Sequence, residues 1–169
     1  MIHMLGAVLV AACCGWTGVL AAGRLRRRAE ALEALCTGLE QLERELSLCL
    51  PPLPQLMADL AGRAPAPARE LFDGCARALE DPDREAFFQT WDRLAQAVPD
   101  LTEEDRRALR PLGQVLGRYD APGQVRAAEE TRRRLEELRA SAREESRRLG
   151  GVYRAMGAAG GGFLAILLL

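Results

Sequence analysis

The sequence predicts an all-α protein: a membrane-tethered antiparallel helical bundle of about six helices, with a transmembrane segment at each end. Ala, Leu, Glu and Arg dominate the 169 residues, and isoleucine occurs only at Ile2 and Ile166, a composition that favours helices over strands. Leucines recur at helical spacing over two long stretches. Acidic residues occur only from Glu30 to Glu145, so the two ends of the chain lack the acidic side chains that are frequent in the middle.

Residues 1–23 are predicted to form an N-terminal transmembrane helix. Met4 to Gly23 contains no charged residue, and twenty helical residues span roughly 30 Å, the thickness of a hydrocarbon core. By the positive-inside rule, the arginines that follow place the N-terminus outside and the rest of the chain in the cytoplasm. These predicted membrane-interface residues are Arg24, Arg26, Arg27 and Arg28. The alternative is a cleaved signal peptide, but such peptides carry their positive charge before the apolar run.

Residues 155–169 are predicted to form a second, C-terminal transmembrane segment. Fifteen uncharged residues are few for a span, but counting from Gly150 gives twenty, with Arg154 at the membrane interface. A re-entrant or interfacial tail is the alternative. Both segments carry small residues that allow close helix packing in lipid, although such residues are common in any span. The predicted packing positions are Gly15, Gly18, Gly157 and Gly161.

Residues 24–154 are predicted to form a cytoplasmic helical bundle built on two long helices. In the first, apolar residues recur at intervals of seven, three and four, as in a coiled coil, until the prolines at 51, 52 and 54. This predicted seam consists of Leu25, Leu32, Leu35, Leu39, Leu42, Leu46 and Cys49. The second helix shows the same spacing, with Glu145 as a polar exception, at Leu135, Leu138, Ala142, Glu145, Leu149 and Val152. Because one helix leaves the membrane and the other returns to it, we expect them to pack antiparallel.

Four shorter helices are predicted between the two long ones. The first two cover about 54–61 and 67–80, where Leu71, Phe72, Cys75 and Leu79 share a face. Asp81 is expected to cap a third, with Pro82 in its first turn. The core stripe of this third helix is predicted to be Phe87, Phe88, Trp91, Leu94 and Val98. Thr102 and Asp105 predict a capping box that opens a fourth helix extending to about Tyr119.

The densely charged stretch from 129 to 148 is the predicted partner-binding region. A solvated face stabilised by pairs four residues apart is the simplest interpretation, and a docking face is the more specific one. The candidate docking residues are Arg132, Arg133, Arg134, Glu136, Glu137, Arg143 and Glu144. The net charge of −1 argues against a dedicated nucleic-acid binder.

The sequence predicts no enzyme. The single histidine is His3, lysine is absent, and no phosphate-binding loop or zinc spacing occurs, so no catalytic residue, metal, cofactor or small-molecule substrate is expected. Cys36, Cys49 and Cys75 lie at apolar helical positions and are interpreted as small buried hydrophobic residues.

The order of elements resembles the stage III sporulation protein AB family over essentially the full length. The resemblance lies in the Leu-Gly-Ala start at residues 5–7, the Leu-Gly-Arg-Tyr-Asp turn at 116–120 and the apolar tail ending at 169. It implies a multi-protein channel complex that links the mother cell to the engulfed forespore. It further implies a helical domain similar to the platform proteins of type II secretion and type IV pilus systems, which contact a cytoplasmic hexameric ATPase.

We therefore expect a non-catalytic membrane platform or adaptor subunit needed for endospore formation. Its expected partners are other membrane subunits of the sporulation channel and a cytoplasmic secretion-type ATPase. The alternative is a coiled-coil sensor or signalling stalk that dimerises through the helix at 25–49. A membrane-bound enzyme is a second alternative, which the lack of catalytic groups disfavours.

Overall fold

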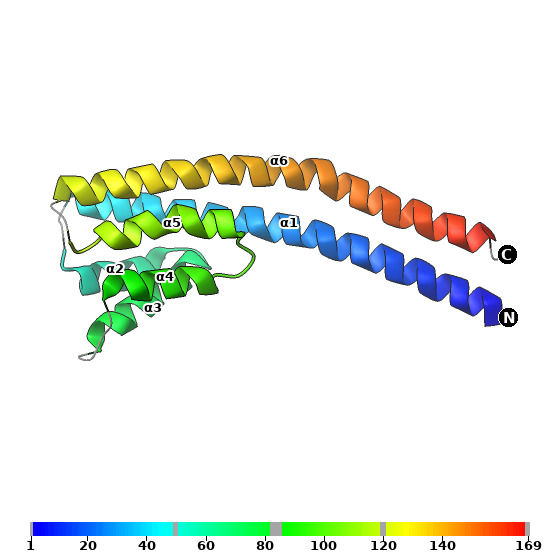
Figure 1. Ribbon diagram of the computed structural model, residues 1–169, viewed down its shortest axis with the longest axis horizontal. Helices are drawn as coiled ribbons and strands as arrows, with labels where there is room; N and C mark the ends of the chain where they lie inside the picture. The colour runs from blue at the N-terminus through cyan, green and yellow to red at the C-terminus, as the bar shows by residue number, and fades with distance from the viewer. Residues whose placement is uncertain (1, 49–50, 82–85, 119–120, 168–169) are drawn as a thin grey trace. The chain divides into compact units, whose positions relative to one another are not determined.

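Among the residues that it describes, the computed structural model contains six helices and no strand (Figure 1). The helices are α1 (Ile2–Leu48), α2 (Leu53–Arg63), α3 (Ala68–Glu80), α4 (Phe87–Ala97), α5 (Glu103–Val115) and α6 (Ala121–Leu167). The structure describes residues 2–48, 51–81, 86–118 and 121–167, and of these only the backbone for 2–19, 21, 150 and 152–167. The prediction of an all-α protein is confirmed.

The chain forms two compact units. One comprises Met1–Ala29 with Ala140–Leu169, and the other comprises Glu30–Arg139. The second unit, here called the bundle unit, holds the second half of α1, the first part of α6 and the four short helices (Figure 1). The first, here called the two-helix unit, contains only segments of α1 and α6.

The core of the bundle unit follows the predicted seam of α1. Leucines along one face of α1 are at most 2% exposed, and on α6 Leu135 and Leu138 are also buried. The buried seam residues of α1 are Leu32, Leu35, Leu39, Leu42 and Leu46. Burying a leucine side chain contributes about 1.5–3 kcal/mol, so this seam is a principal source of stability. Leu25 is half-buried in the two-helix unit, and Cys49 lies outside the described residues.

Trp91 fixes α4 against α5. Its side chain is fully buried, and its indole Nε1 donates a hydrogen bond of 2.9 Å to the carbonyl oxygen of Leu109. Gly113, one turn later on α5, leaves room for the indole: a Cβ there would lie 2.6 Å from Cγ of Trp91. Phe87 and Phe88 are half-buried, and Phe72 of α3 packs against Trp91 with ring centroids 6.5 Å apart.

The predicted start of α4 is wrong. Asp81 does not cap α4; it closes α3 in an extended conformation (φ −74°, ψ 123°). The residue before a proline is biased towards this conformation, which explains why α3 does not continue past Glu80. Helix α4 begins at Phe87, after Ala86. Residues 82–85 lie outside the described ranges.

The capping box of α5 is confirmed, but the predicted end at about Tyr119 is wrong. The amide of Asp105 donates to the Thr102 hydroxyl at 3.3 Å, and the amide of Thr102 donates to the Asp105 carboxylate at 2.8 Å. The helix stops at Val115, since Leu116 is extended and Gly117 has φ +75°, a left-handed conformation that glycine adopts without steric cost.

Among the helical residues with described side chains, none forms a stretch long and apolar enough to cross a membrane. The predicted spans, 1–23 and 155–169, fall almost entirely on residues for which the backbone alone is described. The glycines predicted to pack in the membrane lie there too, at 15, 18, 157 and 161.

Candidate partner-docking groove

The charged residues of α6 that were predicted to bind a partner face different neighbours. Arg132 is directed towards α1, where its Nε donates to Glu43 at 2.9 Å and its Nη1 donates to Glu136 at 2.7 Å. The hydrogen bond that Arg132 donates to Glu43 is the main reason that the pKa of Arg132 rises above its usual value. About a quarter of each side chain of the Arg132–Glu43 pair is exposed, so this pair is half-buried and ties α6 to α1.

Arg134 is directed towards α5 instead. Its Nη2 donates to Glu104 of α5 at 3.0 Å, and its Nη1 donates to Glu137 at 2.9 Å. Both carboxylates and the guanidinium are more than half exposed, and such pairs contribute at most about 1 kcal/mol. Arg134 and Glu104 therefore define one end of the α5–α6 interface without adding much stability.

A groove of about 360 Å³ lies between α5 and α6. Its lining residues are Ala108, Pro111 and Val115 of α5 and Ala127, Glu130, Thr131, Arg133, Arg134 and Glu137 of α6. The floor is made of small apolar side chains, and the charged side chains all come from α6. Arg133, Arg134 and Glu137 are three of the predicted docking residues, and the structure brings them together on this groove.

Two of the charged groove residues are unpaired in the described part of the chain. Arg133 and Glu130 are both exposed, and neither takes part in an ion pair or a side-chain hydrogen bond there. An exposed charge with no internal partner has no ion pair to break when it meets a complementary charge of another protein, although it still loses hydration. Such charges at an interface act on association rate and partner choice more than on raw affinity.

Arg143 and Glu144, the remaining predicted docking residues, belong to the two-helix unit. Both are exposed on α6. In the same unit Arg28 of α1 pairs with Glu145 of α6 at 3.4 Å. Among the predicted membrane-interface residues, Arg24, Arg26 and Arg27 are exposed and Arg28 is half-buried, whereas Arg154 lies outside the described side chains.

The α5 side of the groove was missed by the sequence analysis. Ala108, Pro111 and Val115 lie three and four residues apart, which is the spacing of one helix face. This spacing could have predicted that the three residues share a helix face. The pairing of Arg134 with Glu104 could not be predicted, because 30 residues separate them and no local rule connects them.

The described residues contain no metal-binding cluster, and two of the cysteines are buried. No cluster of three or more His, Cys, Asp or Glu side chains is placed to hold a metal ion there. Cys36 and Cys75 are buried, as predicted. Burial raises the pKa of the Cys36 thiol to about 11, an effect that Arg139 partly opposes, and raises that of Cys75 to about 12. Both thiols are therefore protonated and unreactive at neutral pH.

Comparison with known proteins identifies the family. The family model for stage III sporulation protein AB matches residues 3–169. Stage III sporulation protein AB of Bacillus subtilis (strain 168) is 24% identical over 172 residues, with 100% of both chains covered. A solved structure of a stage III sporulation protein AB has a similar fold: the TM-score is 0.62 at 23% identity, over 71% of this chain and 96% of that one. The chain therefore belongs to the stage III sporulation protein AB family and takes part in sporulation.

Proposed function

We propose that this chain is a non-catalytic membrane platform or adaptor subunit of a secretion-like channel between mother cell and forespore. Its two uncharged ends, 1–23 and 155–169, anchor it in the mother-cell membrane, with the bundle unit in the cytoplasm. There the α5–α6 groove docks a hexameric secretion-type ATPase, and the membrane segments join it to other subunits of the channel.

The observation that carries the docking proposal is the groove with its unpaired charges. It combines an apolar floor at Ala108, Pro111 and Val115 with exposed Arg133 and Glu130. Interfaces commonly bury small apolar patches surrounded by charged or polar rims. Arg132 and Glu136 are left out of the docking surface because they do not line the groove and Arg132 bonds to α1 instead.

The alternative of a dimeric coiled-coil stalk fits less well. Dimerisation through the helix at 25–49 requires its leucine seam to face a second chain. Leu32, Leu35 and Leu42 are instead at most 1% exposed within one chain. A leucine that is already buried has no apolar surface left to gain from dimerisation.

Co-purification of the full chain with the sporulation ATPase tests the proposal. The variant Arg133→Glu should lose most of the bound ATPase, because it reverses an exposed groove charge without breaking an internal ion pair. Arg126→Glu is the matched control, since Arg126 is exposed on the same helix, carries no ion pair in the described part of the chain and does not line the groove.

Equal ATPase recovery with wild type and Arg133→Glu would contradict docking at this groove. Equal loss with both variants would mean that the net charge of α6 matters and the groove does not. Circular dichroism of each variant should match the wild type, which separates lost docking from lost folding.

A further inference from the structure

We propose that the two-helix unit carries a binding site for anionic phospholipid headgroups, formed by arginines from both α1 and α6. We call it the arginine collar. It consists of Arg24, Arg26, Arg27 and Arg28 of α1 and Arg143, Arg147 and Arg148 of α6. The proposal rests on the membrane anchorage proposed above and adds a lipid selectivity to it.

The ion pair between Arg28 and Glu145 shows that the arginines of α1 and those of α6 lie at similar positions along the two helix axes. Its atoms are 3.4 Å apart, so residue 28 of α1 lies beside residue 145 of α6. The helices run in opposite directions, and a helix rises 1.5 Å per residue. Arg24 on α1 and Arg148 on α6 are therefore displaced to the same side of this pair, each by roughly one turn. Arg24 and Arg148, which are 124 residues apart in sequence, therefore lie at a similar position along the two helices.

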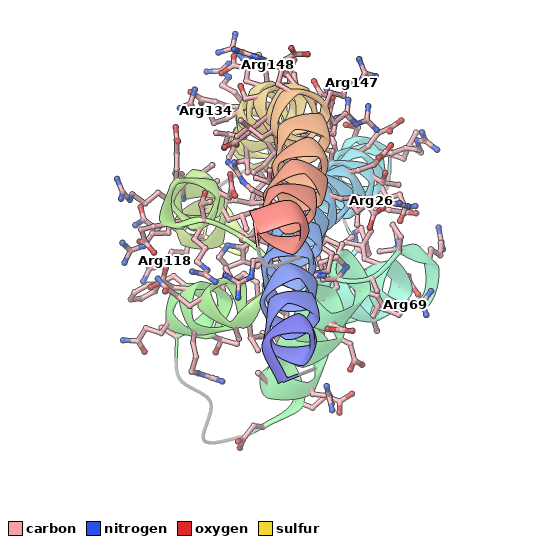
Figure 2. All side chains as sticks on the ribbon, turned by 90° about the vertical axis from the view of Figure 1, so that its right-hand side faces the viewer. Arg26, Arg69, Arg118, Arg134, Arg147 and Arg148 are labelled. Atoms are coloured by element: carbon pink, nitrogen blue, oxygen red, sulfur yellow. The ribbon has the colours of Figure 1, made fainter. Side chains whose placement is uncertain are left out.

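The collar has a large excess of positive charge. Residues 20–29 and 140–151 together contain seven arginines and two glutamates. Arg24, Arg147 and Arg148 are exposed and take part in no ion pair within the described residues. The labelled side chains of Arg26, Arg147 and Arg148 point away from the helices that carry them (Figure 2).

An apolar surface adjoins the collar on the side of the predicted spans. Leu20 lies one turn before Arg24 on the same face of α1, and 48% of its surface is exposed. The uncharged residues 4–23 and 155–169 continue from the two halves of the collar. The exposed guanidinium groups of Arg24, Arg147 and Arg148 next to apolar surface match a phosphate headgroup above its acyl chains, since arginine binds phosphate with paired donors. Each arginine near an anionic membrane surface contributes about 1 kcal/mol of attraction, so several together discriminate between lipids.

Electron paramagnetic resonance of the full chain in phosphatidylcholine bilayers tests this site. Spin-labelled phosphatidylglycerol and spin-labelled phosphatidylcholine are compared for the fraction immobilised at the protein. We expect the wild type to prefer phosphatidylglycerol, and Arg147→Gln/Arg148→Gln to reduce that preference by up to about fivefold for each arginine removed. Arg24→Gln should reduce it too, because the site uses both helices. The control Arg107→Gln/Arg126→Gln removes the same charge from the bundle unit and should keep the wild-type preference.

Several outcomes would overturn the site. A wild type that immobilises both lipids equally rules it out while leaving membrane anchorage intact. A preference unchanged in Arg147→Gln/Arg148→Gln and in Arg24→Gln places lipid selectivity elsewhere. A preference abolished by millimolar inorganic phosphate at constant ionic strength indicates a soluble anion as the ligand. A chain that does not enter the bilayer overturns the membrane anchorage as well, so the two failures are distinguishable.

Discussion

Arg132 of α6 and Glu43 of α1 are joined by a hydrogen bond of 2.9 Å, although 89 residues separate them in the chain. This contact shows that the charges of α6 have two roles. Arg132, with Glu136, holds the two long helices together, whereas Arg133, one residue later, is exposed and unpaired in the described part of the chain. Successive helical residues point about 100° apart, which is how neighbours come to serve different surfaces.

The first prediction concerns this difference between neighbours. Arg132→Met should lower the free energy of unfolding by about 1–2 kcal/mol, because it removes two charge-assisted hydrogen bonds and leaves half-buried Glu43 unpaired. Arg133→Met should change it by less than about 0.5 kcal/mol. Urea denaturation of the full chain in detergent, followed by circular dichroism, measures both. Equal effects of the two substitutions would contradict the assignment of separate roles.

The second prediction concerns the contact between Gly113 and Trp91. Gly113→Ala should destabilise the chain by about 1–3 kcal/mol, because the added methyl group overlaps the buried indole. Gly62→Ala is the matched control: nothing lies within 4 Å of a Cβ there, so alanine should stabilise α2 by about 0.5–1 kcal/mol. Thermal unfolding should move the two midpoints in opposite directions. A stabilising Gly113→Ala would show that α4 and α5 pack differently.

The third prediction concerns the indole hydrogen bond. Trp91→Phe should cost about 1–2 kcal/mol, since it removes the 2.9 Å bond to Leu109 and leaves a small cavity. Phe88→Leu, at a half-exposed position on the same helix, should cost less than about 1 kcal/mol. Chemical denaturation of both variants gives the comparison. A Trp91→Phe protein as stable as the wild type would mean that the hydrogen bond contributes nothing.

The fourth prediction concerns pH. The folded-state pKa values of Cys36 and Cys75, about 11 and about 12, lie above the ordinary value of 9.0. The stability contributed by these neutral thiols is therefore complete below pH 9 and is lost as the pH rises through the folded values. Between pH 9 and 11 the free energy of unfolding should fall by up to about 1.4 kcal/mol per pH unit for each thiol.

The double variant Cys36→Ala/Cys75→Ala isolates this contribution. It should lose less stability over the same pH interval than the wild type does, although it starts from a lower value. If the free energy of unfolding fell equally with pH in the two proteins, ionisation of these thiols would contribute nothing to the loss of stability. A thiol reagent at pH 8 should label Cys36 and Cys75 of the wild type only after denaturation.

The sequence was sufficient wherever the determining contacts are local or periodic. The leucine spacing in α1 predicted which face is buried, and the pair Thr102–Asp105 predicted the start of α5 to the residue. It failed where two local rules compete: Pro82 can open a helix or end the preceding one, and Asp81 adopts the extended conformation that ends it.

The candidate site was predictable only in part, for a similar reason. Periodicity shows that the charged residues of α6 lie outside the seam, but it does not show which neighbouring helix each one faces. Arg132 meets α1 and Arg134 meets α5, and both contacts depend on tertiary packing. The apolar floor from α5 completes the groove, and its place opposite α6 was not predictable from the sequence of either helix alone.

The most direct test of ATPase docking is site-specific photo-crosslinking in sporulating cells. A photo-reactive phenylalanine analogue at Ala108, a half-buried residue that lines the groove, should give a covalent adduct with the ATPase. The same analogue at Glu70, exposed on α3 and not part of the groove, is the control and should give none. An adduct from Ala108 alone is the result that we predict. No ATPase adduct from Ala108, or an equally strong one from Glu70, would contradict docking at the α5–α6 groove.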